Sequence, residues 1–99
     1  MRELIEAIEA GTEVRLLMRK AFPDGYVCAM TAYDGDMNAA LALMAAVLPG
    51  WSWQIEDGFA AVWIGDPITV PTFRLIDAEA DTPARALLLA ILRAMEGGK

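Results

Sequence analysis

The chain has 99 residues, of which 57% are hydrophobic, and a formal net charge of −6 at pH 7. This length predicts one small domain, residues 1–99. The apolar fraction exceeds the usual value of about 45–50%, so we expect part of the apolar surplus to face a partner. Residues 21–84 hold nine acids and one base, Arg74. Such a surface repels nucleic-acid phosphates, and we therefore expect no direct binding to nucleic acid but a partner with a basic surface.

Neither a membrane span nor an export signal is predicted. A Pro-Gly pair interrupts the longest uncharged run, residues 37–55, whereas a spanning helix needs about 20 consecutive apolar residues. Glu3 and Glu6 stand where a signal peptide would have its apolar core. Cys28 is the single cysteine and cannot form an internal disulfide, as is typical of proteins in a reducing compartment. We therefore expect a cytoplasmic protein that does not associate with membranes.

Two short helices are predicted near the N-terminus. Apolar residues recur at helical spacing in residues 4–8 and again in residues 14–21. Gly11 separates the two stretches, and Thr12 can serve as the N-cap of the second. Pro-Asp-Gly at residues 23–25 suits a tight turn. Residues 26–33 are mixed in character and predict no regular element.

A third helix is predicted over residues 37–48, which are rich in alanine and leucine. Asp34 and Asp36 precede it and favour the positive end of its dipole, while Pro49-Gly50 ends it. The helix is apolar nearly all round. Helices of this kind are normally enclosed on more than one side, so we expect the same here.

A β-hairpin is predicted over residues 51–64, because apolar and polar residues alternate on both sides of Asp57-Gly58. Two registers are open, and a shift between them moves side chains to the opposite face. A two-residue loop would group the first strand's apolar residues with Ala60, Val62 and Ile64. We favour the three-residue loop, 56–58. This register places the following residues on one face: Trp51, Trp53, Ile55, Phe59, Ala61 and Trp63.

The C-terminal part of the chain predicts a third strand and a last helix. Residues 68–76 suit a strand, which Pro71 restricts to a sheet edge or a late start. Thr82 is typical of an N-cap and Pro83 of the first helical position, so we expect a helix from Pro83 to about Glu96. The predicted fold is α+β in the order αα-α-β-β-β-α, with a small antiparallel sheet, the hairpin plus a third strand, packed between α-helices.

Residues that could support catalysis or bind metal are scarce. The chain has no histidine, which removes the commonest general base and transition-metal ligand. Cys28 lies among uncharged residues and suits a structural role better than a nucleophilic one. Residues 34–38 match the first ligands of a calcium loop, but Ala39 and Ala45 replace its glycine and closing glutamate, which favours helix capping. We expect no enzyme activity, no cofactor and no metal.

The remaining carboxylates and the tryptophans have alternative interpretations. Six acids could include an acid-base pair, but we expect them to be solvated charges in or beside turns. They are Glu56, Asp57, Asp66, Asp77, Glu79 and Asp81. Tryptophans at strand spacing are more often core residues than a stacking platform, although they could form a binding face. These are Trp51, Trp53 and Trp63.

Several segments, taken in order, resemble a family of bacteriophage and prophage proteins, the phage ABA sandwich domain. The segments are Leu4–Ala10, Asn38–Leu43, Pro49–Trp53, Thr82–Leu87 and Leu92–Ala94. The resemblance implies a sheet with helices on both faces and a phage setting, but no catalytic residues. The chain departs from the family pattern at residues 33–37, which are longer and more acidic.

These observations predict a non-enzymatic phage accessory protein that binds a host protein. The resemblance and the acidic charge suggest an anti-defence role, similar to that of anti-CRISPR proteins, against a partner with a basic surface such as a CRISPR effector. The alternative is a structural or morphogenetic phage protein that self-associates as a homodimer. In the first case acidic loops would guide the contact. The candidate residues are Asp34, Asp36, Glu56, Asp57 and Asp66.

Overall fold

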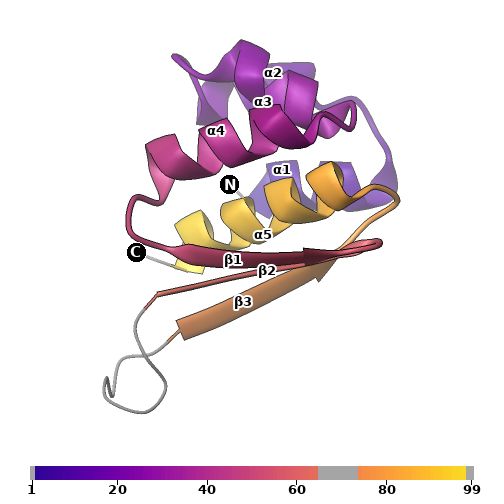
Figure 1. The fold of residues 1–99 in the computed structure, drawn as a ribbon. Helices are drawn as coiled ribbons and strands as arrows, with labels where there is room; N and C mark the ends of the chain where they lie inside the picture. The colour runs from indigo at the N-terminus through magenta and orange to yellow at the C-terminus, as the bar shows by residue number, and fades with distance from the viewer. Residues whose placement is uncertain (1, 65–73, 98–99) are drawn as a thin grey trace.

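The computed structural model describes residues 2–64 and 74–97 of the chain. The described residues form five helices and a three-stranded antiparallel sheet, which confirms the predicted α+β class (Figure 1). In chain order the elements are α1 (Arg2–Ala10), α2 (Arg15–Ala21), α3 (Tyr26–Tyr33), α4 (Met37–Val47), β1 (Ser52–Glu56), β2 (Phe59–Ile64), β3 (Arg74–Glu79) and α5 (Pro83–Gly97).

The sheet has the order β1-β2-β3, and the hairpin has a two-residue loop. Glu56 pairs with Phe59, which leaves only Asp57 and Gly58 between the strands. The prediction of a three-residue loop is therefore wrong. Gly58 has a φ of +75°, which glycine adopts without a steric penalty, and it closes the shorter loop. Because the register differs, Trp53 and Ile55 share a face with Val62 and Ala60.

Strand β3 confirms the predicted third strand over residues 74–76 and continues to Glu79. Residues 68–73 of that prediction, with Pro71, lie outside the described residues. The expectation that Asp77 lies in or beside a turn is wrong, because it lies within β3 and pairs with Ala61, whereas Glu79 ends β3 beside the loop to α5 as expected. Acidic residues fit a strand where its alternate positions face solvent.

Helix α5 lies at the centre of the described structure. Figure 1 shows the sheet on one side of α5 and helices α3 and α4 on the other. Thr82 caps the helix as predicted, since its Oγ1 accepts a hydrogen bond from the Arg85 backbone N–H at 3.1 Å. Every residue from Ala84 to Ala94 is buried except Arg85 and Arg93, which are half-buried. The core is therefore arranged around this one helix.

Among the described residues, α5 is the only helix whose backbone lies close to the backbone of the strands. It packs on one face of the sheet, where Ala60, Val62 and Ala78 are buried. Within residues 2–64 and 74–97 no helix packs on the other face, which differs from the helices on both faces that the family resemblance implies. The physical reason is that α1, α3 and α4 pack around α5 and join the one apolar core that α5 forms with the sheet.

The first two helices form as predicted, on either side of Gly11, but the predicted N-cap of α2 is wrong. The Thr12 hydroxyl donates back to the Ala7 carbonyl at 3.3 Å. The carboxylate of Glu13 instead accepts a hydrogen bond from the Arg15 backbone N–H at 2.8 Å. This interaction satisfies one of the free donors at the start of α2.

Helix α4 confirms the predicted third helix, whereas α3 was not predicted. The sequence predicted no element over residues 26–33, where α3 forms and buries Ala29 and Ala32. Helix α4 packs against both α3 and α5, so it is enclosed on more than one side as expected, while its outward face, which includes Ala42 and Ala45, is exposed. Alanine is equally suited to buried and exposed helical positions, so the sequence of α4 did not indicate which of its faces is exposed.

Candidate functional site

Three loops meet at one end of the molecule: α3–α4, β1–β2 and β3–α5. The Ala80 backbone N–H donates to the Gly58 carbonyl at 3.0 Å, which joins the second and third loops. The backbone of Gly35 approaches Thr82, whose Cγ2 lies 4.0 Å from the position of a Cβ at residue 35. Figure 1 shows this end at the right. We term it the acidic end and define it by five exposed residues: Asp34, Asp36, Glu56, Asp57 and Asp81.

The structure brings together four of the five predicted contact residues. Asp66 lies outside the described residues. Asp36 also caps α4, since its Oδ1 accepts a hydrogen bond from the Ala39 backbone N–H at 3.1 Å, as the capping interpretation of residues 34–38 predicted. Asp81 was predicted only as a solvated loop charge. Its position directly before the Thr82 N-cap is the signal that could have placed it at this end.

Arg85 is the one cation in the described residues of these loops and the first turn of α5. Its Nε and Nη2 donate to the Tyr33 carbonyl oxygen at 3.0 and 2.8 Å, and its guanidinium lies 4.1 Å from the centre of the Tyr33 ring. The Asp81 Oδ2 lies 3.9 Å from the Arg85 Nη1. The donors of Arg85 are thus directed at the carbonyl of Tyr33, the last residue of α3, and the five carboxylates leave the acidic end strongly negative.

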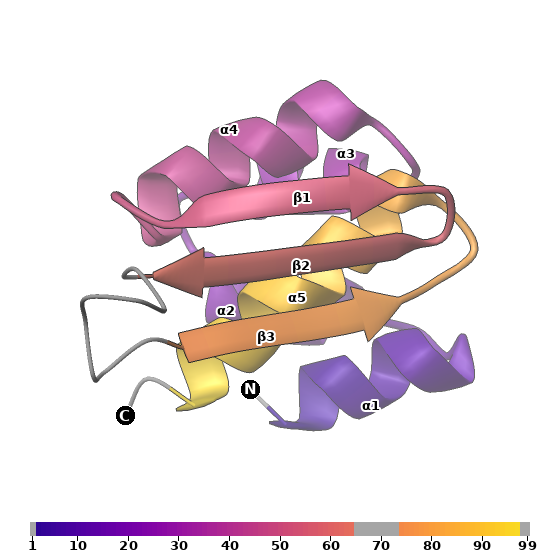
Figure 2. The same ribbon diagram turned by 60° about the horizontal axis from the view of Figure 1, so that its bottom comes forward.

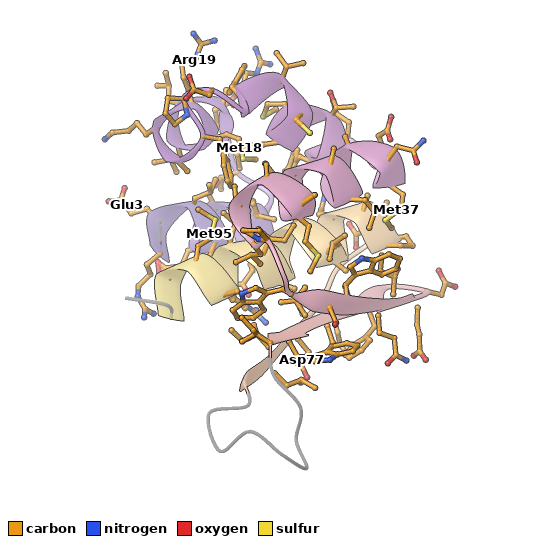
Figure 3. The ribbon with its side chains drawn as sticks, turned by 60° about the vertical axis from the view of Figure 1, so that its left-hand side comes forward. Glu3, Met18, Arg19, Met37, Asp77 and Met95 are labelled. Atoms are coloured by element: carbon orange, nitrogen blue, oxygen red, sulfur yellow. The ribbon has the colours of Figure 1, made fainter. Side chains whose placement is uncertain are left out.

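A second surface is the face of the sheet turned away from α5, which we term the open face. Side chains of paired residues lie on the same face of an antiparallel sheet, so the register defines its members. They are Ser52, Gln54 and Glu56 on β1, Phe59, Ala61 and Trp63 on β2, and Leu75, Asp77 and Glu79 on β3. Figure 2 shows the sheet from this side, with α5 behind it. In Figure 3, Asp77 lies at the sheet, far from Met18 and Met37 of the helices.

The open face is apolar along its centre. Phe59 and Trp63 are half-buried, and Leu75 on the neighbouring strand is 53% exposed. Ala61 is only 5% exposed although it is not part of the core around α5. It lies between Phe59 and Trp63 in the row along β2, where these two side chains flank it. Clustered apolar side chains of this kind on a surface mark a contact site.

The three tryptophans have different surroundings. Trp51 is half-buried against the core, as predicted. Trp53 lies on the helix-facing side of the edge strand and is 48% exposed, and Trp63 is on the open face. The prediction that tryptophans are core residues is therefore confirmed for Trp51 alone. The hairpin register, for which the sequence left two alternatives, determines the face of the sheet on which Trp53 and Trp63 lie.

The described residues offer little for metal or covalent chemistry. No group of three or more metal-ligating side chains occurs among them. The Cys28 Sγ–H donates to the Ala39 carbonyl at 3.0 Å and joins α3 to α4, in keeping with a structural role. A groove of about 430 Å³ lies between the end of α1 and the β3–α5 loop, with Glu9, Glu79 and Arg85 in its lining. Its one cation is Arg85, which is already bound to Tyr33.

No protein-family model, no curated protein and no solved structure matches the chain. Within residues 2–64 and 74–97, no helix has the length and apolar character needed to cross a bilayer. The function must therefore be argued from the two surfaces of the molecule itself, the acidic end and the open face.

Proposed function

We propose that the protein acts by binding another protein that has a basic surface, and that it catalyses no reaction. The observation that carries this proposal is the convergence of three loops at the acidic end. Five exposed carboxylates lie there, and Arg85, the one cation in the described residues of these loops and the first turn of α5, already donates to the Tyr33 carbonyl. Carboxylates of like charge repel one another, so such a cluster costs stability unless a basic partner neutralises it. A binding role explains why they lie together.

The acidic end would act mainly on the rate of association. Complementary charges steer two proteins together and raise the association rate, and this effect weakens as salt screens the charges. The resemblance to the phage family favours a host protein in the bacterial cytoplasm. Defence complexes of the CRISPR type expose basic channels for nucleic acid, and they fit as targets of an anti-defence inhibitor.

The proposal can be tested by affinity capture from a bacterial lysate that contains such defence complexes, followed by measurement of the association rate with the purified partner. The test variant combines Asp34→Asn, Asp57→Asn and Asp81→Asn, which keeps the Asp36 cap intact. The matched control removes the same number of charges elsewhere, with Glu3→Gln, Glu6→Gln and Asp24→Asn. Asp24 lines a hollow beside Val47 and Met95, at the opposite end of α4 and α5.

We expect the test variant to lower the association rate by about tenfold or more at low salt, and the control variant to change it far less. We also expect the rate for the unchanged protein to fall as the salt concentration rises. Equal rates for the two variants, or binding that salt does not affect, would contradict the role of the acidic end.

A second candidate function, a self-associating structural protein, draws on the open face. Apolar surface on a sheet can form a homodimer interface. However, pairing two copies of this face would bring two sets of three carboxylates together, which disfavours it. Analytical ultracentrifugation at micromolar concentration separates the candidates, since a dimer supports self-association and a monomer contradicts it.

A further inference from the structure

We infer that the open face of the sheet docks a basic amphipathic helix of the partner protein. This inference rests on the proposed function and deepens it, because it names the surface and the chemistry of the partner segment. It draws on three features of the open face: its size, the position of its apolar row and the sign of its charges.

The dimensions of the open face suit one helix. Strands of five and six residues are about 17–20 Å long at about 3.3 Å per residue. Three strands spaced by about 4.8 Å place the outer strands about 10 Å apart, which matches the diameter of about 10–12 Å of a helix with its side chains. A helical segment of about 12 residues, at about 1.5 Å per residue, would cover the face from end to end.

The residue pattern specifies what that helix must present. Phe59, Ala61 and Trp63 form an apolar row along the central strand β2. Polar residues follow on both sides of this row: Gln54 and Glu56 on β1, and Asp77 and Glu79 on β3. A helix lying along β2 would therefore need an apolar ridge toward the sheet and basic residues on both flanks. Aromatic anchors surrounded by polar residues are typical of binding hot spots.

The charges identify a basic partner rather than a second copy of the chain. The nine residues of the open face include three acids and no Lys or Arg. Gln54 donates to Glu56 at 3.4 Å and neutralises none of this charge. Arg93 reaches β3 through the backbone carbonyl of Asp77, at 2.9 Å, and leaves that carboxylate without an ion pair among the described residues. Lysine or arginine on the partner helix would supply the missing opposite charge.

The experiment uses the full chain and two synthetic peptides of about 18 residues, long enough to span the face at about 1.5 Å per residue. Both carry leucine at helical spacing, flanked by lysine in one peptide and by glutamate in the other. Binding is measured by isothermal titration calorimetry, and the contact residues are mapped from amide chemical shifts in NMR spectra.

The test variants are Trp63→Ala, Leu75→Ser and the pair Asp77→Asn with Glu79→Gln. The Asp34, Asp57 and Asp81 triple variant is the control. Circular dichroism melts confirm that each variant folds.

We expect the lysine peptide to bind and the glutamate peptide not to bind. Trp63→Ala and the Asp77/Glu79 pair should each weaken binding by about tenfold, whereas the control variant should change it less than about threefold because its residues lie off the face. Amide shifts should concentrate in β2 and β3. Leu75→Ser provides a second apolar test at the sheet edge if Trp63→Ala fails to fold.

Three results would overturn the inference. Equal binding of both peptides would contradict the role of charge in recognition. Amide chemical-shift changes confined to α2–α4 would show that the peptide does not contact the open face. Binding that Trp63→Ala leaves intact and the acidic-end variant abolishes would assign the peptide to the acidic end. The last result would leave the proposed function standing. Conversely, failure of lysate capture together with peptide binding to the open face would contradict the acidic end and not this inference.

Discussion

At the scale of single residues, two arginines of α5 connect the helix to its neighbours. Arg85 donates to the Tyr33 carbonyl of α3, and Arg93 donates to the Asp77 carbonyl of β3 and pairs with Glu9 of α1. From the sequence, Arg85 and Arg93 could be recognised only as two charged residues in a predicted apolar helix. Their partners lie 16 to 84 residues away in the chain, so no local pattern could have identified them.

Replacement of Arg85 by lysine tests this role. Lysine keeps the charge but lacks the planar group that donates twice to the Tyr33 carbonyl and stacks on the Tyr33 ring. We expect Arg85→Lys to lower the free energy of unfolding by about 1–2 kcal/mol in urea denaturation. Arg15→Lys, at an exposed position on α2, is the control and should stay within about 0.5 kcal/mol. Equal effects would contradict the role of Arg85.

Glu13 provides a pH-dependent prediction. The hydrogen bond from the Arg15 backbone N–H lowers the pKa of the Glu13 carboxyl below its ordinary value. A lowered pKa in the folded state means that the stabilising contribution is present above the unfolded pKa and is lost as pH falls through the folded pKa. NMR titration should therefore show the Glu13 carboxyl titrating at lower pH in the folded protein than in the urea-unfolded protein, with the Arg15 amide signal shifting over the same pH range. A Glu13 pKa that is the same in the folded and the unfolded protein would disprove the interaction.

At the scale of elements, α5 determines the stability of the fold. Leu88 is fully buried within the core. We expect Leu88→Ala to lower the free energy of unfolding by about 2–5 kcal/mol, because it removes apolar contacts and leaves a cavity. Leu16→Ala, on an α2 side chain that is 76% exposed, should change it by about 0.5 kcal/mol or less. Chemical denaturation of both variants measures the difference, and a loss below about 1 kcal/mol for Leu88→Ala would contradict the central position of α5.

The elements with strong local signals were predictable, and those decided by tertiary contacts were not. The Thr82 cap and apolar run of α5 carry their own start signal, and so does the hairpin around Asp57-Gly58. Helix α3 carries no amphipathic pattern, because its own small and aromatic residues are distributed over all of its faces. The hairpin register depended on which face packs against α5, and this information is absent from the strands themselves.

At the scale of the whole molecule, repulsion among the clustered negative charges should lower the Tm at low salt. Raising the salt from about 0.01 M to about 0.1 M shortens the Debye length from about 30 Å to about 10 Å and screens the repulsion at the acidic end. We expect the Tm to rise over this range, and to rise less in the Asp34, Asp57 and Asp81 triple variant. Differential scanning calorimetry checks both. An identical rise in the two proteins would place the dominant repulsion elsewhere.

The two candidate surfaces differ in how far the sequence could reveal them. The loop acids of the acidic end were recognised individually, because acids beside turn signals are exposed in most folds. Their convergence required the contacts between Gly35 and Thr82 and between Gly58 and Ala80. The open face could not be predicted, because it depends on the two-residue loop and on the inclusion of Asp77 and Glu79 in β3.

The central position of α5 also bears on protein synthesis. The ribosome makes α1–α4 and the whole sheet before it makes α5. Until α5 leaves the exit tunnel, the apolar residues of α1, α3, α4 and β2 that pack on it have no partner to bury them. The elements that pack on α5 therefore stay open to chaperones and proteases until α5 emerges, and the core forms only after that point.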